Sequence, residues 1–178
     1  VNELAWSANS DHIMLAHGGP ACGGLTVIAH DAEKGALSLA YESHAHAAPG
    51  MGLRVDPTYR YLALGSTDMS VSLWSLEDLV VEHTLVDLDN TVSNMSFSGD
   101  GSHVALCADG SDTVQIYHAR MGKASCVPLQ SARGHISVLD WHPRSPLIAV
   151  GGDRPRPPVK SLNQARHFAR PKASLIDH

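Results

Sequence analysis

The sequence predicts an all-β protein in which a four-stranded unit repeats about three and a half times. Short apolar runs, bounded by Gly, Pro, Asp and Ser, follow one another along the first 150 residues, as expected for strands. The same order of runs returns after 42 to 49 residues, which indicates an internal repeat. No segment in this region shows the period of a helix, although residues 76–79 fit a turn.

A fixed spacing defines the first two strands of each unit. An aromatic or apolar anchor lies near the end of the first run, and an apolar residue of the second run follows seven positions later. The anchors are Trp6, Val55, Phe97 and Trp141, and the residues seven positions later are Ile13, Leu62, Val104 and Ile148. A polar turn separates the two runs, so each pair is expected to form an antiparallel hairpin.

The first three units each contain a third and a fourth run. The third runs cover residues 25–28, 71–74 and 114–117, and the weaker fourth runs cover residues 37–41, 81–85 and the region around 125–127. Asp100–Gly101 and Asp109–Gly110 fit tight turns between strands, because glycine adopts positive φ at little cost.

Four antiparallel strands in a repeat of this length are typical of a β-propeller blade. Residues 1–152 are therefore expected to form three blades and half of a fourth. We expect them to be part of a larger ring, because closed propellers have about four to eight blades. The chain has no initiator Met, which fits a portion of a longer protein.

Residues 153–178 have a different character. Pro155, Pro157 and Pro158 cannot donate to a strand ladder, and the rest of the segment is basic without alternation. This Pro-rich tail is expected to be disordered or non-native. The alternative is a basic arm that contacts RNA.

Charge and composition exclude several classes of function. Residues 1–150 carry 16 acidic and 7 basic side chains, whereas residues 151–178 carry 2 acidic and 6 basic ones. The blades are therefore poor candidates for direct binding to nucleic-acid phosphates. No apolar run is long enough to cross a bilayer, and the first residues do not read as a signal peptide. Three widely spaced cysteines, Cys22, Cys107 and Cys126, favour a reducing compartment.

The repeat resembles the WD40 family of β-propellers. Trp74–Ser75 stands where that family usually has Trp-Asp, and Ala45–His46 and Gly134–His135 stand at its Gly-His position. Within the family, the chain is similar to WD-repeat subunits of the machinery that couples transcription to mRNA export. The segments that carry this likeness are residues 1–6, 56–68, 71–80, 96–101 and 141–149. Such chains have further blades and close the last one with a strand that residues 153–178 do not show.

The resemblance implies a buried hydrogen-bonded tetrad of His46, Ser66, Asp68 and Trp74. The alternative for the first three is a catalytic triad, which no GxSxG elbow supports. His44 and His46 suit a zinc ion, but no third ligand follows at a suitable spacing. No nucleotide-binding glycine motif is present. We therefore expect no metal, no cofactor and no small-molecule substrate.

The resemblance also implies a nuclear, non-catalytic scaffold whose partners are other protein subunits, with RNA contacted indirectly at most and no membrane. The candidate partner contacts are Arg54, Tyr59, Arg60 and Arg144, which the repeat register places beside or between strands. Two alternatives stay open.

The first alternative is a WD-repeat adaptor of another assembly, a ubiquitin ligase or a chromatin complex. The second is an enzyme that uses the central channel. The enzyme is disfavoured because the strands expected to face the channel carry small apolar residues such as Ala63, Ala105 and Ala149.

Overall fold

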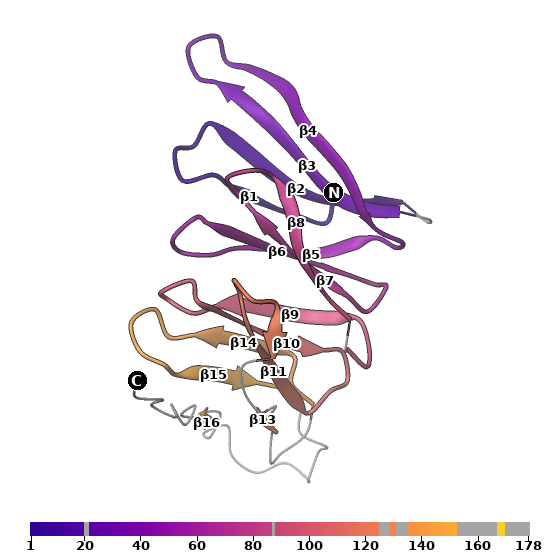
Figure 1. Ribbon diagram of the computed structural model, residues 1–178, viewed down its shortest axis with the longest axis vertical. Coiled ribbons are helices and arrows are strands. Elements are labelled where there is room, and N and C mark those ends of the chain that lie inside the picture. Colours follow the sequence, from indigo (N-terminus) through magenta and orange to yellow (C-terminus); the bar gives the residue numbers. More distant parts are fainter. Residues whose placement is uncertain (20–21, 87, 125–128, 131–134, 153–166, 170–178) are drawn as a thin grey trace, which may run out of the picture.

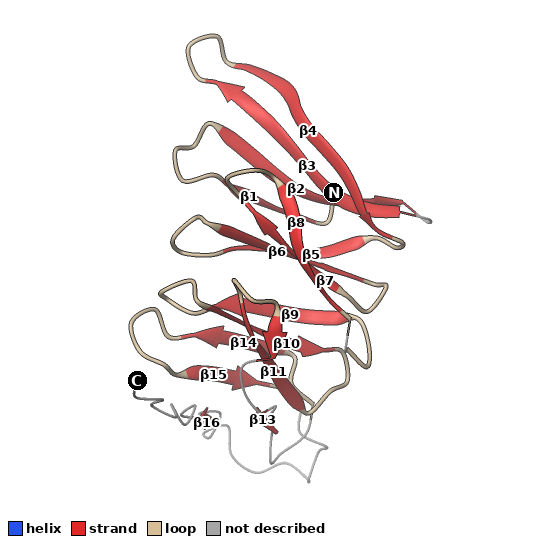
Figure 2. Ribbon diagram, viewed as in Figure 1, coloured by secondary structure: helices blue, strands red, loops and turns tan. Residues whose placement is uncertain are grey.

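The chain folds into four antiparallel sheets that follow one another in sequence order (Figure 1). This computed structural model describes residues 1–19, 22–86, 88–124, 129–130, 135–152 and 167–169. Strands joined by turns make up these segments, and Figure 2 shows no helix among them. Within the same segments, no helix is available to cross a membrane. The prediction of an all-β fold is therefore confirmed.

The first two sheets are regular four-stranded meanders. Sheet one has the order β1 (Glu3–Trp6), β2 (His12–Gly19), β3 (Cys22–Asp31), β4 (Ala36–His46). Sheet two has the order β5 (Gly50–Val55), β6 (Tyr61–Ser66), β7 (Val71–Ser75), β8 (Val80–Leu85). Residues 76–79 form the expected turn before β8.

The third and fourth sheets follow the same plan with shorter outer strands. Sheet three contains β9 (Val92–Phe97), β10 (His103–Ala108), β11 (Thr113–His118) and β12 (Lys123–Ala124), and β13 (Leu129–Gln130) also pairs with β11. Sheet four contains β14 (Val138–Trp141), β15 (Ile148–Gly151) and β16 (His167–Ala169).

The seven-residue spacing becomes a direct cross-strand pair in every sheet. The pairs are Trp6 with Ile13, Val55 with Leu62, Phe97 with Val104, and Trp141 with Ile148. Each anchor thus lies on the same sheet face as the apolar residue seven positions later, because partners across a ladder point to the same side. The predicted register is confirmed.

Both faces of the inner sheets are apolar because each is packed between two neighbours. On β6, Leu62 and Leu64 face sheet one, whereas Ala63 between them faces sheet three. On β10, Val104 and Leu106 face sheet two, whereas Ala105 faces sheet four. The period of two along a strand sends alternate residues to opposite cores.

The first strands of the sheets lie side by side along one edge of the stack. Strand β1 contacts β5, β5 contacts β9, and β9 contacts β14. We call this edge, where the first strands of successive sheets meet, the inner side of the stack. The second strands do not line it. The expectation that Ala63, Ala105 and Ala149 face a channel is wrong, because they belong to β6, β10 and β15. Two of them, Ala63 and Ala105, are buried between sheets.

The turn after each anchor is built in the same way in the first three sheets. The side-chain oxygen of the residue after the anchor accepts a hydrogen bond from the backbone N–H five positions later. The pairs are Ser7 with His12 at 3.0 Å, Asp56 with Tyr61 at 2.6 Å, and Ser98 with His103 at 3.0 Å. The residue four positions after the anchor has a positive φ, at Ser10, Tyr59 and Gly101. Gly110 also has a positive φ, so the glycines of both predicted Asp–Gly turns behave as expected.

Part of the C-terminal segment continues sheet four. The backbone of β16 pairs antiparallel with β15, from Ile148 opposite Ala169 to Val150 opposite His167. The sequence predicts only two strands here. The additional pairing satisfies backbone groups that β15 would otherwise leave open at a sheet edge. The expectation of disorder for the remainder of residues 153–178 lies outside the described residues.

Substitution of Gly101 tests how tightly neighbouring turns pack. Gly101 has φ of +70°, and a Cβ atom there would overlap the Asp56 carboxylate of the preceding sheet. We expect Gly101→Ala to lower the free energy of unfolding by more than about 2 kcal/mol, since backbone strain and overlap add.

The matched control is Gly110→Ala. Gly110 has φ of +71° with no atom near its added Cβ, so only the backbone cost of about 1 kcal/mol applies. Urea denaturation followed by circular dichroism measures both variants. Equal losses would show that the contact between turns contributes nothing.

Candidate functional site

A buried chain of hydrogen bonds joins sheet two to the strand that precedes it. The His46 imidazole lies at the end of β4, with Nδ1 at 3.1 Å from Asp68 Oδ2 and Nε2 at 2.8 Å from Ser72 Oγ. Trp74 Nε1–H donates to the same Ser72 oxygen at 2.8 Å. The structure therefore links three of the four predicted tetrad residues through Ser72.

The bonding partners assign the proton on His46. A carboxylate only accepts, so Nδ1 carries the hydrogen that faces Asp68, while Nε2 shares a hydrogen bond with the Ser72 hydroxyl. The Ser72 oxygen in turn accepts from Trp74. Each polar group of this hydrogen-bond chain, from Asp68 to Trp74, has a partner. The free-energy cost of burying it without a hydrogen bond is therefore avoided.

Ser66 occupies a different place from the one expected. Its hydroxyl donates to the Ala48 carbonyl at 3.0 Å and accepts from the Asp68 N–H at 3.2 Å. It thus supports the turn that carries Asp68, while Ser72 bridges His46 and Trp74. The sequence signal for Ser72 is its position two residues before Trp74, since residues i and i+2 share a strand face.

The Asp68 carboxylate is held in its charged form. Partial burial by itself raises its pKa, but the Ser70 hydroxyl and the neighbouring His46 outweigh this and lower the pKa below the ordinary value. The Ser70 Oγ–H donates to Asp68 Oδ1 at 2.6 Å, and the Ala47 N–H donates to Oδ2 at 3.1 Å. Asp68 therefore fixes both the imidazole and the loop before β5.

The contacts do not match the alternative triad of Ser66, His46 and Asp68, because the Ser66 hydroxyl donates to the Ala48 carbonyl. Ser72, which does contact His46, is no better placed as a nucleophile. His46 and Ser72 are both buried, and the Ser72 hydroxyl lies between His46 and the Trp74 indole. A nucleophile must reach a substrate, and this hydroxyl faces only its hydrogen-bond partners and the packed core between sheets one and two. The geometry serves to position strands.

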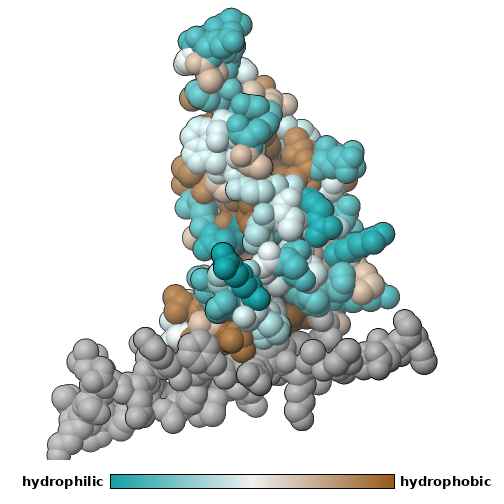
Figure 3. All heavy atoms as spheres, turned by 90° about the vertical axis from the view of Figure 1, so that its left-hand side faces the viewer, coloured by the Kyte–Doolittle hydropathy of each residue, from teal (hydrophilic) through white to brown (hydrophobic). Residues whose placement is uncertain are grey.

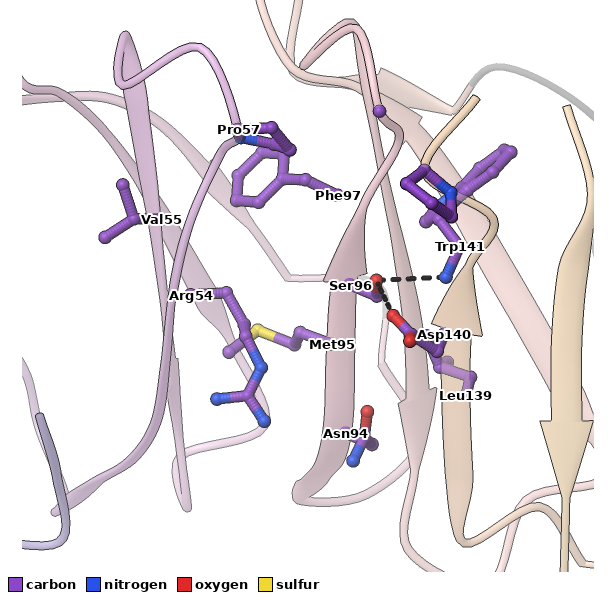
Figure 4. A pocket seen from close by; sticks show the side chains of 12 residues that line it. Arg54, Val55, Pro57, Asn94, Met95, Ser96, Phe97, Leu139, Asp140 and Trp141 are labelled. Carbon is purple, nitrogen blue, oxygen red and sulfur yellow. Dashed lines mark hydrogen bonds between the residues drawn. The ribbon is translucent and has the colours of Figure 1, made fainter. Parts of the chain in front are cut away.

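A groove of about 610 Å³ runs along the first strands of sheets two, three and four (Figure 4). Arg54 on β5 and Asn94 and Ser96 on β9 supply polar groups to it. The Ser96 hydroxyl donates to Asp140 Oδ1 at 2.8 Å and accepts from the Trp141 N–H at 3.1 Å, which ties β9 to β14. No Cys or His is among the residues that line this groove.

A second hollow of about 460 Å³ continues the groove towards sheet one. Arg54 lies between the two hollows and forms an ion pair with Glu3 of β1. The Glu3 carboxylate also accepts from the Leu53 N–H at 2.6 Å. Arg54 is thus engaged within the chain, and its charge is largely offset at this place.

The other predicted contact residues lie on the hairpin turns that follow the anchors. We call the row of turns 56–60, 98–102 and 142–146 the hairpin-turn face. The Arg60 guanidinium reaches the Asp100 carbonyl at 3.4 Å, and an added Cβ on Gly99 would overlap the Pro143 carbonyl. The three turns therefore pack in a row, and Figure 3 looks onto this side of the molecule.

Tyr59, Arg60 and Arg144 present their side chains on this hairpin-turn face. Tyr59 and Arg144 are exposed, and the Arg60 guanidinium lies 5.7 Å from the centre of the Tyr61 ring. In Figure 3 polar residues predominate on this side, with apolar patches between them. Arg54, by contrast, lies in the groove, so the structure does not bring the four predicted contacts together.

The metal interpretation finds no support in the described segments. They contain no cluster of three or more His, Cys, Asp or Glu side chains that fits a metal ion. His44 packs edge to face against His17 with ring centres 5.4 Å apart, and His46 is engaged with Asp68. Cys22 and Cys107 are free thiols, and Cys126 lies outside the described residues.

The sequence comparison agrees with this blade geometry. The family model described as "WD domain, G-beta repeat" matches residues 126–154. The fold is that of a partial WD40-type β-propeller. One solved structure with a similar fold is the Cps50 (Swd1) β-propeller domain from Myceliophteria thermophila, with a TM-score of 0.68 and 20% identity. The match covers 84% of this chain and 49% of the other, and it shows the propeller fold.

Two curated relatives match most of the chain. THO complex subunit 3 of Arabidopsis thaliana is 30% identical over 157 residues, covering 88% of this chain and 47% of its own length. WD repeat-containing protein AAC3 of Dictyostelium discoideum is 30% identical over 155 residues, covering 84% of this chain and 30% of its own length. The chain therefore spans about half, or less, of the relatives that it matches.

Removal of the Ser72 hydroxyl tests the buried hydrogen-bond chain that joins His46 to Trp74. Ser72→Ala leaves His46 Nε2 and Trp74 Nε1 without partners in the core, so we expect the free energy of unfolding to fall by about 2–4 kcal/mol. Ser72→Thr keeps the hydroxyl and is expected to retain most of the stability. Urea denaturation measures both, and a loss below about 0.5 kcal/mol for Ser72→Ala would contradict the assignment.

Acid titration tests the turns at Asp100. Hydrogen bonds from Ser98 and Ser102 lower the pKa of Asp100 from 3.8 to about 2. The unfolded chain therefore takes up this proton first, so the stabilisation is complete above pH 3.8 and is lost as the pH falls towards 2.

The comparison uses Asp100→Asn, which cannot titrate. Its stability is expected to change less than that of the natural chain between pH 4 and pH 2, as measured by urea midpoints at closely spaced pH values. Parallel curves for the two proteins would contradict the role of Asp100.

Proposed function

We propose that this chain is a non-catalytic scaffold subunit of a THO-type complex in the nucleus, within the larger transcription–export (TREX) assembly. In this role it supports mRNA processing and export through contacts with other THO and TREX protein subunits. RNA is contacted through those subunits, and no small-molecule substrate or membrane is involved.

The observation that carries this proposal is the 30% identity with THO complex subunit 3 over 88% of the chain. The charge distribution supports it, since residues 1–150 carry 16 acidic and 7 basic side chains and would repel RNA phosphates. The buried hydrogen-bond chain of sheet two and the unoccupied hairpin-turn face fit a protein that presents a rigid surface.

The hairpin-turn face is the proposed partner surface. Tyr59 and Arg60 on one turn and Arg144 on another expose an aromatic ring and cationic groups, which are residue types enriched at interfaces. Arg54 is a weaker contact within this proposal, because it is already paired with Glu3. A partner with acidic side chains suits this face.

A second candidate function is an adaptor role in another assembly, such as a ubiquitin ligase or chromatin complex. The AAC3 protein keeps this candidate open, because it is also 30% identical to the chain and its name carries no THO role. The blades are the same in both cases, and the identity of the partners separates the two.

Affinity capture of the tagged chain from nuclear extract, read by mass spectrometry, tests the proposal. We expect recovery of the other THO subunits. Recovery of ubiquitin-ligase or chromatin subunits in their place would overturn the THO assignment and support the adaptor role.

A charge reversal tests the proposed surface. Arg60→Glu is expected to lower THO recovery about tenfold, as the loss of a favourable interface charge pair does. Met69→Glu is the matched control, because Met69 is exposed on the turn at the opposite end of strand β6. Equal recovery with both variants would place the partner elsewhere on the chain.

A further inference from the structure

The end of the stack opposite the hairpin-turn face carries a different charge. We call this end the loop face, and it consists of residues 47–49, 67–70, 88–91 and 109–112, which lie in the connections after β4, β6, β8 and β10 (Figure 1). These residues include Asp68, Asp89, Asp109 and Asp112 and contain no Lys or Arg. The electrostatic potential of the loop face is therefore negative, and it attracts cationic groups.

The hollow of about 460 Å³ on the inner side of the stack extends to the loop face. Its lining includes Thr91 and Asp109 of the loop face, together with Asn2 and Met51 near the loop-face ends of β1 and β5. Pockets of roughly 300–1,000 Å³ hold small organic groups. The hollow is therefore large enough to admit a long side chain of another molecule.

Asp109 presents its carboxylate to this hollow from a fixed backbone. The Asp109 N–H donates to the Thr91 carbonyl at 2.7 Å, and the Asp109 carbonyl accepts from the Asn90 side chain at 3.1 Å. Among the described residues, no hydrogen bond or ion pair involves the Asp109 carboxylate or the side-chain amide of Asn94, which also lines the hollow. The hollow thus offers one anionic and one neutral acceptor to a bound group.

Other lining residues suit the aliphatic part of a basic side chain. The thioether side chains of Met51 and Met95 line the hollow, and Met51 is 46% exposed. Gly52 has no side chain to fill the space beside them, and an added Cβ there would lie 3.2 Å from Met95 Cε. Methionine adapts its shape to bound apolar groups. Lys and Arg bury their aliphatic stems on such surfaces while their charged ends stay at polar groups.

The net charge of the lining is negative, because the ion pair with Glu3 offsets Arg54 and nothing offsets Asp109. We propose that the hollow binds a basic segment of a partner protein, with the stem of a Lys or Arg side chain on Met51 and its charge at Asp109. Charge-assisted hydrogen bonds of this kind are roughly twice as strong as neutral ones. A nucleic acid does not suit this face, because its phosphates would be repelled. The proposal does not rest on the THO role, and it concerns the end of the stack opposite the hairpin-turn face.

A peptide-binding experiment with the full chain tests the proposal. The probe is the fluorescein-labelled peptide Gly-Ser-Leu-Lys-Leu-Arg-Leu-Ser-Gly, and the comparison probe has Glu in place of Lys and Arg. Fluorescence anisotropy is expected to show saturable binding of the basic peptide and none of the acidic one. Asp109→Asn is expected to weaken the binding of the basic peptide about tenfold, as the loss of one favourable charge contact does. An Asn-Gly pair suits the turn before β11 as well as Asp-Gly does, so the fold is retained.

Asp89→Asn is the matched control, because Asp89 is exposed on the loop face and is not among the residues that line the hollow. This variant removes the same charge and is expected to change the affinity less than about twofold, since salt screens exposed charges that do not touch the peptide. Asp109→Lys is expected to bind the acidic peptide in place of the basic one. A misfolded variant would not show such a reversal.

Three results would overturn the proposal. The first is no binding of the basic peptide. The second is an equal loss of affinity in Asp109→Asn and Asp89→Asn, which would show a general attraction without a site. The third is displacement of the labelled peptide by spermidine as effectively as by unlabelled peptide, because the hollow would then take any small polycation. Affinity capture of a non-THO assembly would overturn the proposed function and leave this inference intact.

Discussion

Two-sided burial of the inner sheets, two and three, is the constraint on which the rest of the structure depends. Each inner sheet contacts one neighbour through its odd positions and another through its even positions, so the middle of both faces is apolar. Leu62 and Ala63 are adjacent in sequence and belong to different cores. Among the described residues, many polar side chains lie in the turns, along β5, β9 and β14, or in the buried hydrogen-bond chain that begins at His46. Each of these polar places is a candidate for function for that reason.

The repeat could be predicted from sequence because its spacing is a direct consequence of hairpin geometry. Trp6 and Ile13 are seven residues apart, and they pair across the ladder because the turn between them has a fixed length. The inner side could not be predicted in the same way. Whether β5 or β6 lies on the inner side of the stack depends on how neighbouring sheets pack against each other. The periodicity of apolar residues along one strand carries no information about that packing. Hence Ala63 was expected to face a channel, whereas the residues along the first strands, which line the groove, include Arg54 and Ser96.

The buried hydrogen-bond chain was likewise predictable from the sequence only in part. His46, Asp68 and Trp74 were identified through the resemblance to WD40 repeats, whose buried tetrad they match in position. Ser66 was expected as the fourth member, but Ser72 takes that place because its hydroxyl faces the imidazole. Both serines are buried and hydrogen-bonded, so burial alone does not distinguish them. The position of Ser72 two residues before Trp74 is the local feature that does.

Sheets two and three contact each other both near their first strands and near their last strands. Met95 of β9 packs into the same core as Ala63 and Leu73 of sheet two, and at the outer rim the His83 imidazole of β8 lies 2.9 Å from the Arg120 carbonyl beyond β11. Contacts at both edges restrain rotation of one sheet against the other more than contacts at one edge would. The spacing between turns 56–60 and 98–102 is therefore restrained within the chain itself. A partner that matches this spacing loses little freedom to ordering of the scaffold, and one that does not match cannot be accommodated by adjustment.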